Sequence, residues 1–172
     1  PKVYDPDVVE FAKKAQDPSK DLSGFGQTLN RSDDGDGFMS NILWDYGGGV
    51  FDKDGKPALG GAFLKQNTAA LQFAVDTIKK HGIQPPGVMG WTDVSNNEAY
   101  MAGKLVTTNN GASLYYAMVS KKHELAAKTL CVLTPGGLFL LGMPSVNKLM
   151  EAGFHAIGFG DINDHHVTAP QQ

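Results

Sequence analysis

The sequence predicts a layered α/β fold with a mostly parallel sheet, because helical patterns alternate with single strand-like runs. The chain has 172 residues, of which 41% are hydrophobic, and this suits one domain with a sizeable core. Apolar residues recur at helical spacing in 5–17, 34–49, 67–82 and 113–128. Strand-like runs lie at 23–29, 105–109 and 130–134. No repeat or low-complexity segment interrupts this alternation.

The first half of the chain carries clear helix starts and stops. Asp5 is a plausible N-cap and Pro6 suits a first helical turn. The helix in 34–49 is closed by glycines, and Trp44 within it is expected in the core. The residues 52–55, "DKDG", then predict a turn inside a short two-stranded excursion.

The second half of the chain also carries signals for where helices start and stop. The helix in 67–82 carries an apolar face with Leu71, Ala74, Val75 and Ile78 and stops at Gly82. Ser95 and Glu98 form a capping-box pattern, so Ser95 is the expected N-cap of the helix that follows. Ser113 is likewise expected to cap the next helix. Beyond it, 145–153 suggests a further helix and 154–160 a further strand, before a polar tail.

Composition excludes several classes of protein. The formal net charge is -3 with scattered charges, whereas a nucleic-acid-binding protein would show a basic stripe. No apolar run approaches the ~20 residues of a membrane-spanning helix. The single cysteine, Cys131, rules out an internal disulfide framework and a cysteine zinc cluster, and its strand-like setting favours a buried thiol.

No catalytic constellation is visible, so we expect no enzyme activity and no cofactor. The sequence contains no G-x-S-x-G elbow, no P-loop and no G-x-G-x-x-G. The histidines have no evident triad partners; they are His81, His123, His155, His165 and His166.

Two clusters of metal-ligating residue types leave a metal-stabilised module as an alternative. The stretch 33–36 contains Asp33, Asp34 and Asp36, but the glutamate that an EF-hand needs is replaced by Trp44 or Asp45. The tail offers a second cluster, made of Asp161, Asp164, His165 and His166. At a helix start, carboxylates and backbone N–H groups can instead bind polyhydroxylated ligands.

A ligand site is expected where the strand 105–109 ends. The turn after it contains Asn109, Asn110 and Gly111, and ligands of α/β proteins sit at the carboxyl ends of strands. Trp91 lies on a loop near Asp93 and combines a flat apolar face with hydrogen-bonding neighbours, which suits a sugar ring. Simple loop packing of Trp91 is an equally good interpretation.

Several motifs together resemble the extracellular solute-binding proteins, family 1, of ABC importers, whose members mostly carry sugars. They include "GFG", "RSDDGDGFMSNILWDYGGGVFDKDGKPAL", "IKKHGIQPPG", "NNEAYMAGKLVTTNNG" and "VLTPGG", and span about 2–137. The most specific family stretch, "xAFxxGKxAMxxNGxW", reads here "EAYMAGKLVTTNNGASLYY". This chain has Ala112 and Ser113 where the family often places an aromatic residue, and Tyr115 follows a little later.

The resemblance implies two α/β lobes joined by a hinge, with the ligand held between them. Residues 1–137 would be the second, C-terminal lobe of a type II periplasmic binding protein, and 138–172 an additional helix, strand and tail. The chain is therefore expected to be a separate lobe or a fragment that lacks the first lobe of the same protein.

By this resemblance, the lobe would bind a carbohydrate and work with an ABC permease, without nucleic acid, in the periplasm or outside the cell. The predicted ligand-binding residues are Arg31, Asp34, Asp36, Trp91, Asp93, Asn110, Gly111, Ser113 and Tyr115.

Overall fold

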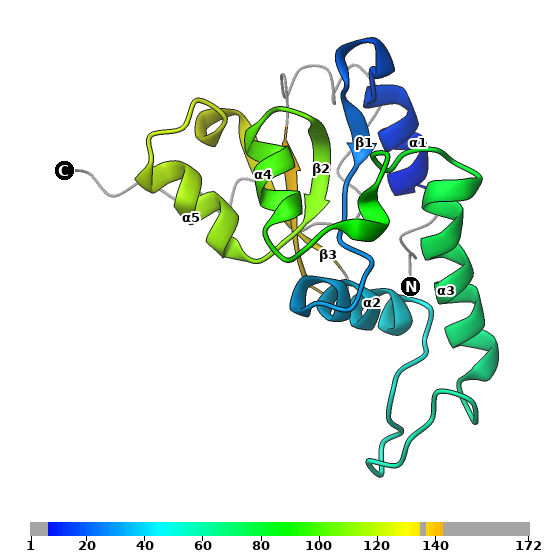
Figure 1. Ribbon diagram of the computed structural model, residues 1–172. Helices are drawn as coiled ribbons and strands as arrows, with labels where there is room; N and C mark the ends of the chain where they lie inside the picture. Colours follow the sequence, from blue (N-terminus) through cyan, green and yellow to red (C-terminus); the bar gives the residue numbers. More distant parts are fainter. Residues whose placement is uncertain (1–6, 135–136, 143–172) are drawn as a thin grey trace.

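A four-stranded sheet lies at the centre of the computed structural model, which describes residues 7–134 and 137–142 (Figure 1). The strand order is β1-β2-β4-β3. The strands are β1 (Ser23–Phe25), β2 (Leu105–Asn109), β3 (Thr129–Thr134) and β4 (Gly137–Gly142). β1 and β2 are parallel, and β4 runs antiparallel to both β2 and β3.

The predicted α/β class is confirmed, and the three predicted strands share one direction. β4 was not predicted; it follows β3 after two residues and pairs with it from Thr129–Gly142 to Thr134–Gly137. This hairpin places β4 between β2 and β3, so two of the three described strand pairs are antiparallel. β4 also begins at the boundary of the two predicted domains, a division that stays a prediction.

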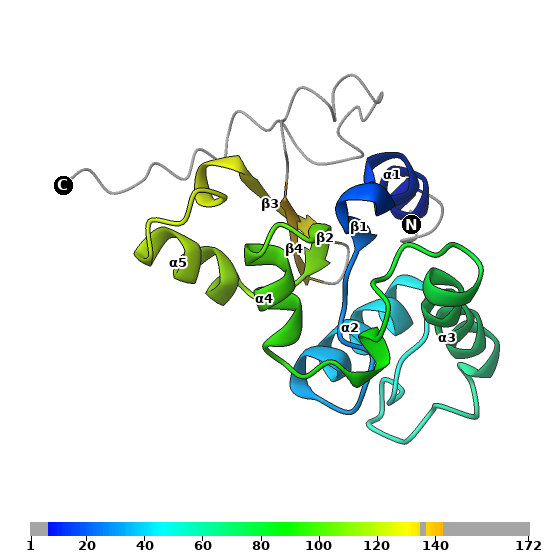
Figure 2. The ribbon, with the colours of Figure 1, turned by 45° about the horizontal axis from the view of Figure 1, so that its top comes forward.

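Five α-helices surround the described strands. They are α1 (Asp7–Ala15), α2 (Asp33–Asp45), α3 (Leu64–Lys79), α4 (Ser95–Met101) and α5 (Ala112–Ser120). Figure 2 shows α4 and α5 on one side of β2, with α1 and α3 on the other. The predicted cap of the first helix, at Asp5 and Pro6, lies outside the described residues.

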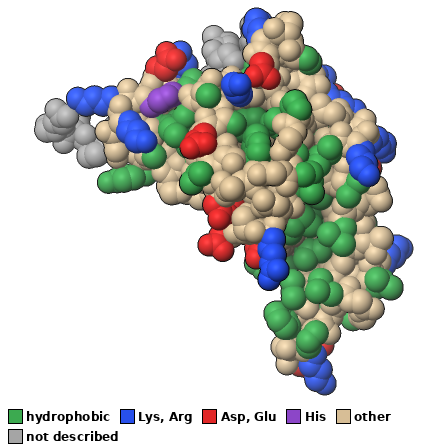
Figure 3. All heavy atoms as spheres, viewed as in Figure 1, with side chains coloured by type: hydrophobic (Ala, Val, Ile, Leu, Met, Phe, Trp, Pro, Cys, Tyr) green, Lys and Arg blue, Asp and Glu red, His purple; other side chains and the backbone are tan. Residues whose placement is uncertain are grey.

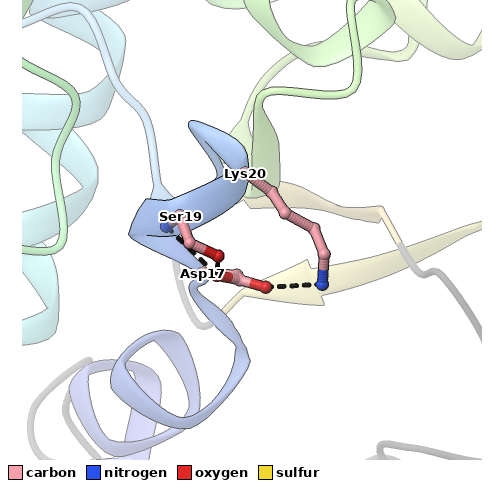
Figure 4. A network of polar contacts seen from close by, with 3 residues as sticks. All are labelled: Asp17, Ser19 and Lys20. Atoms are coloured by element: carbon pink, nitrogen blue, oxygen red, sulfur yellow. Dashed lines mark hydrogen bonds and ion pairs between the residues drawn. The ribbon is translucent and has the colours of Figure 1, made fainter.

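A small polar network shapes the turn between α1 and β1 (Figure 4). The Asp17 carboxylate accepts hydrogen bonds from the Ser19 hydroxyl at 2.6 Å and from the Lys20 Nζ at 2.6 Å. It also accepts one from the Ser19 backbone N–H at 3.2 Å, which caps a short 3-10 helix. Asp17 and Leu22 then form a bridge that turns the chain into β1.

Two main apolar clusters hold the helices in place, beside a third in which Phe11 of α1 packs against Val106 of β2. The larger one joins α2 and α3 to β1, with the rings of Phe25 and Phe38 5.6 Å apart and Phe73 within the same cluster. The smaller one joins α4 and α5 to β2 through Tyr100, Leu105, Leu114 and Met118.

Two predicted helix caps are wrong. Ser95 is the first residue of α4, after Val94, and its Oγ accepts the Thr92 backbone N–H at 2.9 Å. Because that oxygen serves the preceding turn, the predicted box with Glu98 does not form. Ser113 is the second residue of α5, and Gly111 occupies the N-cap position without a side-chain hydrogen bond.

The predicted burial of Trp44 is wrong, because 59% of this residue is exposed. The predicted apolar face of α3 is confirmed only in part: Ala74 is buried and Ile78 is half-buried, whereas Leu71 and Val75 lie on the outer face. α3 instead buries the neighbouring stripe, made of Ala70, Phe73, Ala74 and Thr77. Figure 3 shows hydrophobic side chains gathered between α2 and α3 and over the segment 46–63.

The segment between α2 and α3 projects from the body of the molecule (Figure 1). Its tip is the predicted "DKDG" turn, in which Asp52 Oδ1 accepts the backbone N–H groups of Asp54 and Lys56, each at 2.9 Å. Gly55 adopts a φ of 75°, and Phe51 pairs with Pro57 across the turn. The predicted turn is therefore confirmed.

Candidate functional site

A depression of about 220 Å³ lies where the start of α2 meets the end of β2. Its lining residues are Asp33, Asp34, Gly37, Phe38, Asn41, Asn109, Asn110 and Gly111. Figure 3 shows acidic side chains gathered over the start of α2. The depression thus forms at the carboxyl end of β2, the edge where the sequence predicts a site.

The α2 side of the depression is held by a cap and by the loop before α4. Ser32 Oγ accepts the Gly35 backbone N–H at 3.1 Å and caps the helix. The Asp34 backbone N–H donates to Asp93 Oδ1 at 2.9 Å, and Asp34 Oδ2 accepts from Asn96 Nδ2 at 2.9 Å. Asp93 and Asn96 therefore position Asp34 at the rim.

The charge on Asp34 is costly in this position. Partial burial raises the pKa of the Asp34 carboxyl above its usual value, and the hydrogen bond from Asn96 opposes this. The nearby carboxylates of Asp93 and Asp33 raise the pKa further. A ligand hydroxyl that donates to Asp34 would stabilise the charged form, because hydrogen bonds to a carboxylate favour its ionisation.

The β2 side of the depression is part of the protein interior. All five residues of β2 are buried, and Asn110 just after it is 6% exposed. The side chain of Asn110 donates a hydrogen bond to the side chain of Asn97. Buried Asn96, which also bonds Asp34, comes within 3.5 Å of the Asn109 carbonyl oxygen. One turn of α4 thus links the two sides.

Two glycines keep the backbone bare within the depression, although the fold does not require them to be glycine. A Cβ added to Gly37 would meet no atom within 4 Å. A Cβ on Gly111 would meet only the Ser113 Oγ at 3.7 Å, an ordinary contact, and Gly111 has a φ of -70°. Gly35 differs, because its Cβ would lie 2.3 Å from the Asn30 carbonyl oxygen.

The structure divides the predicted ligand-binding residues into three groups. Asp34, Asn110 and Gly111 line the depression, and Asp93 supports Asp34 from behind. Trp91 and Tyr115 are half-buried and pack against the apolar cluster of α4 and α5. The remaining predicted residues, Arg31, Asp36 and Ser113, are exposed and lie outside the lining.

Some lining residues were missed as ligand contacts by sequence reasoning. Gly37, Phe38 and Asn41 follow Asp34 at helical spacing, so a helical wheel centred on Asp34 would have found them. Asp33 was considered as a metal ligand or as one of the helix-start carboxylates that could bind hydroxyl groups, and Asn109 as part of the turn, but neither was among the predicted ligand-binding residues.

The lining has a distinct chemical character. It combines two carboxylates and three amides with one aromatic ring, and it includes no lysine, arginine or histidine. Carboxylates accept hydrogen bonds from hydroxyl groups, and amides both donate and accept them. This set suits a ligand with many hydroxyl groups and disfavours an anion.

The alternative metal sites gain no support where they can be assessed. Among the described residues, no three histidine, cysteine or carboxylate side chains converge as they would around a metal ion. The second predicted cluster, in 161–166, lies outside the described part of the chain.

Cys131 is half-buried, and burial raises the pKa of its thiol to about 11. None of the helices in the described ranges has the length and apolarity to cross a membrane.

Comparison with solved structures places the fold among solute-binding proteins of ABC transporters. The chain is similar to maltose-bound MalE3 of T. maritima, with 27% identity, a TM-score of 0.66, and coverage of 88% of this chain and 41% of that protein. It is also similar to an ABC transporter solute-binding protein from Agrobacterium vitis S4 with bound D-mannitol, at 25% identity and a TM-score of 0.64. That match covers 87% of this chain and 37% of the relative.

A third match supports the fold alone. It is a solute-binding protein from Thermotoga lettingae TMO bound with alpha-D-tagatose, at 19% identity and a TM-score of 0.67, covering 89% of this chain and 40% of that one. The chain therefore spans about two fifths of the length of these proteins. No protein-family profile and no curated protein sequence matches it. The neighbours named here are binding proteins rather than enzymes, and the predicted lobe fold is confirmed.

Proposed function

We propose that this chain is one lobe of a carbohydrate-binding protein of an ABC import system, and that its ligand occupies the depression between α2 and β2. A first lobe of the same protein would close over the ligand, and an ABC permease would receive it. Such a protein works in the periplasm or outside the cell and needs no cofactor and no nucleic acid.

The observation that carries this proposal is the convergence of the start of α2 and the end of β2 on one polar depression. Asp34 and Asn110 face it from elements far apart in the sequence, and Gly37 and Gly111 leave room for a ligand to reach the backbone. The neighbours at 27% and 25% identity hold maltose and D-mannitol, both uncharged polyhydroxylated molecules. The lining chemistry agrees with that class of ligand.

One lobe supplies only part of the contacts with such a ligand. A two-lobe site of micromolar strength corresponds to roughly -8 kcal/mol. Half of the contacts, set against most of the association entropy, leave a few kcal/mol at best. We therefore expect the isolated chain to bind sugars at about millimolar strength.

Saturation-transfer NMR detects binding in this range and tests the proposal directly. Maltose and D-mannitol should each show transferred signal from the isolated chain. The signal should weaken strongly in Asn41→Ala and Asn110→Ala, which remove amides from the two sides of the depression. Glucose 6-phosphate should give less signal than glucose, because its phosphate would approach Asp33 and Asp34.

Gln72→Ala provides the control, because Gln72 is exposed on α3 outside the depression. It should leave the transferred signal unchanged, and circular dichroism should show all variants folded. Absence of transferred signal with every sugar would contradict the proposed function. So would a signal in Asn41→Ala and Asn110→Ala as strong as in the original chain. Micromolar binding by the isolated chain would contradict the view that it is one lobe.

A further inference from the structure

One stripe of α2 runs out of the depression and ends at a tryptophan. Asp34, Gly37 and Asn41 line the depression, and Trp44 is the next residue on the same face, three positions after Asn41. Three residues of an α-helix span about 4.5 Å along its axis. Along the axis of α2, Trp44 therefore follows the lining residue Asn41 at a separation comparable to the length of one sugar ring.

Trp44 is exposed to an unusual degree for its type. Tryptophan is large and is highly buried on average, whereas 59% of Trp44 is accessible. Phe38 and Ile42 on the neighbouring face of α2 fill the core. The burial of α2 is thus complete without Trp44, and packing of the helix gives no reason for an indole here.

Trp44 lies next to a glycine loop, Gly48 and Gly49, whose backbone is held by hydrogen bonds and carries no side chains. Its Cδ1 lies 3.9 Å from the point that a Cβ on Gly49 would occupy. Gly49 is fixed by buried Asn67, which accepts from its N–H and donates to its carbonyl oxygen, each at 3.0 Å. A Cβ on Gly48 would fall 2.0 Å from Asn67 Oδ1, so this loop can approach Asn67 only with glycine. The indole of Trp44 therefore lies close to the hydrogen-bonded backbone of Gly49.

We propose that Trp44 forms a second sugar subsite, so that the ligand has at least two rings and extends from the depression along α2. One ring would bond to the carboxylates and amides of the depression, and the next would lay its apolar face on the indole. This inference rests on the proposed function and adds a residue and a ligand size to it.

Other large apolar side chains of α3 and of the segment before it are exposed as well, namely Val50, Phe51, Leu59, Leu64, Leu71 and Val75. A protein contact is therefore the competing role for Trp44. The sugar subsite is favoured because Trp44 continues the polar lining of the depression on the same helical stripe.

Sugar binding and fluorescence together test the inference, with D-glucose and maltose as probes. Trp44→Ala should weaken maltose binding roughly 3- to 10-fold, the value of one stacked ring, and leave glucose binding within about 2-fold. The chain has two tryptophans, so Trp91→Phe leaves Trp44 as the single emitter. Maltose should quench or blue-shift this emission much more than glucose does. In Trp44→Phe, maltose should leave the emission of Trp91 nearly unchanged.

Leu71→Ala is the matched control, because Leu71 is 53% exposed on α3, off the stripe of α2. It should bind both sugars as the original chain does. Equal maltose affinity in Trp44→Ala, with Asn110→Ala losing both sugars, would overturn the second subsite and leave the proposed function intact. Loss of self-association in Trp44→Ala, seen by sedimentation without a change in maltose binding, would also overturn it. Failure of both sugars to bind the original chain would instead contradict the proposed function.

Discussion

The two ends of α2 follow opposite rules. At its start, Ser32 caps the helix and Asp33, Asp34 and Asp36 place negative charge where the helix dipole favours it. At its end, Asp45 is a buried carboxylate where the dipole disfavours it, and Trp44 beside it is exposed. A helix with ordinary amphipathic burial would exchange these two side chains.

This difference separates what stabilises the protein from what serves a ligand. The start of α2 is stabilised by local contacts, and its open side faces the depression. The end of α2 buries a charge and exposes an indole, and both choices reduce stability. Departures from local rules concentrate at functional sites, and the end of α2 therefore agrees with the second subsite proposed there.

Of the substitutions predicted here, Asp45→Asn should give the largest change in the free energy of unfolding. Asp45 is 7% exposed, its Oδ2 has no hydrogen-bond partner among the described residues, and burial raises the pKa of its carboxyl to about 6. A raised pKa means that the folded state holds the proton more tightly, so stability falls as the pH rises from 3.8 to about 6, and the full cost of the charge is present above that. Asp45→Asn should therefore increase the free energy of unfolding by on the order of 1–3 kcal/mol near pH 8.

Urea unfolding across a pH series checks this prediction. The advantage of Asp45→Asn should shrink as the pH falls below about 6 and vanish below the ordinary aspartate pKa of 3.8. Asp36→Asn, an exposed position in the first turn of the same helix, is the control and should show the opposite sign, lowering the free energy of unfolding by under about 1 kcal/mol because its charge complements the helix dipole. An advantage that does not depend on pH would show that the buried charge is not its cause.

Loss of the cap at the opposite end of α2 should have the next largest effect. Ser32→Ala removes the Oγ that accepts the Gly35 N–H at 3.1 Å, and should lower the free energy of unfolding by about 1 kcal/mol. Ser40→Ala, in the middle of the same helix, should be neutral or slightly stabilising because alanine favours helix. Equal effects of the two changes in urea unfolding would show that Ser32 is not a cap.

The smallest effect concerns the open glycine of the depression. Gly37→Ala should raise the free energy of unfolding by roughly 0.5–1 kcal/mol, because the Cβ meets no atom and alanine suits a helix interior. The same change should weaken sugar binding in the NMR assay. Gly35→Ala is the contrast, since its Cβ would clash with the Asn30 carbonyl oxygen and should destabilise the protein. A destabilised Gly37→Ala would mean that Gly37 serves the fold.

The sequence predicted the fold class and most of the elements because these depend on local periodicity. β2 was predicted at its observed bounds, since a run rich in β-branched residues ends at an amide and glycine turn. The capping box at Ser95 failed for a local reason of another kind, because Thr92 offered a nearer N–H to the same oxygen. For the candidate site, the end of β2 and Asp34 were predicted, whereas Gly37, Phe38 and Asn41 were not.

Burial of one stripe rather than its neighbour cannot be read from spacing alone. α3 presents two overlapping stripes with apolar residues, and the one with Phe73 packs inward because its ring meets Tyr46 and the core of α2, with the rings of Tyr46 and Phe73 6.1 Å apart. The outward position of Trp44 has the same origin, since Phe38 and Ile42 already fill the space beneath α2. Which face of a helix is buried thus depends on how well each face packs against residues from distant parts of the chain.

By itself, the sequence determined the α/β class, the turn at 52–55 and the edge of the sheet that carries the candidate site. Only the tertiary structure decided that β4 enters between β2 and β3, and that α4 joins Asp34 to Asn110 through Asn96 and Asn97. It also decided that Trp91 packs, half-buried, against the apolar cluster of α4 and α5, while Trp44 faces solvent. The reason is physical, because periods of 2 and 3.6 residues define the faces of an element but not the element that covers each face.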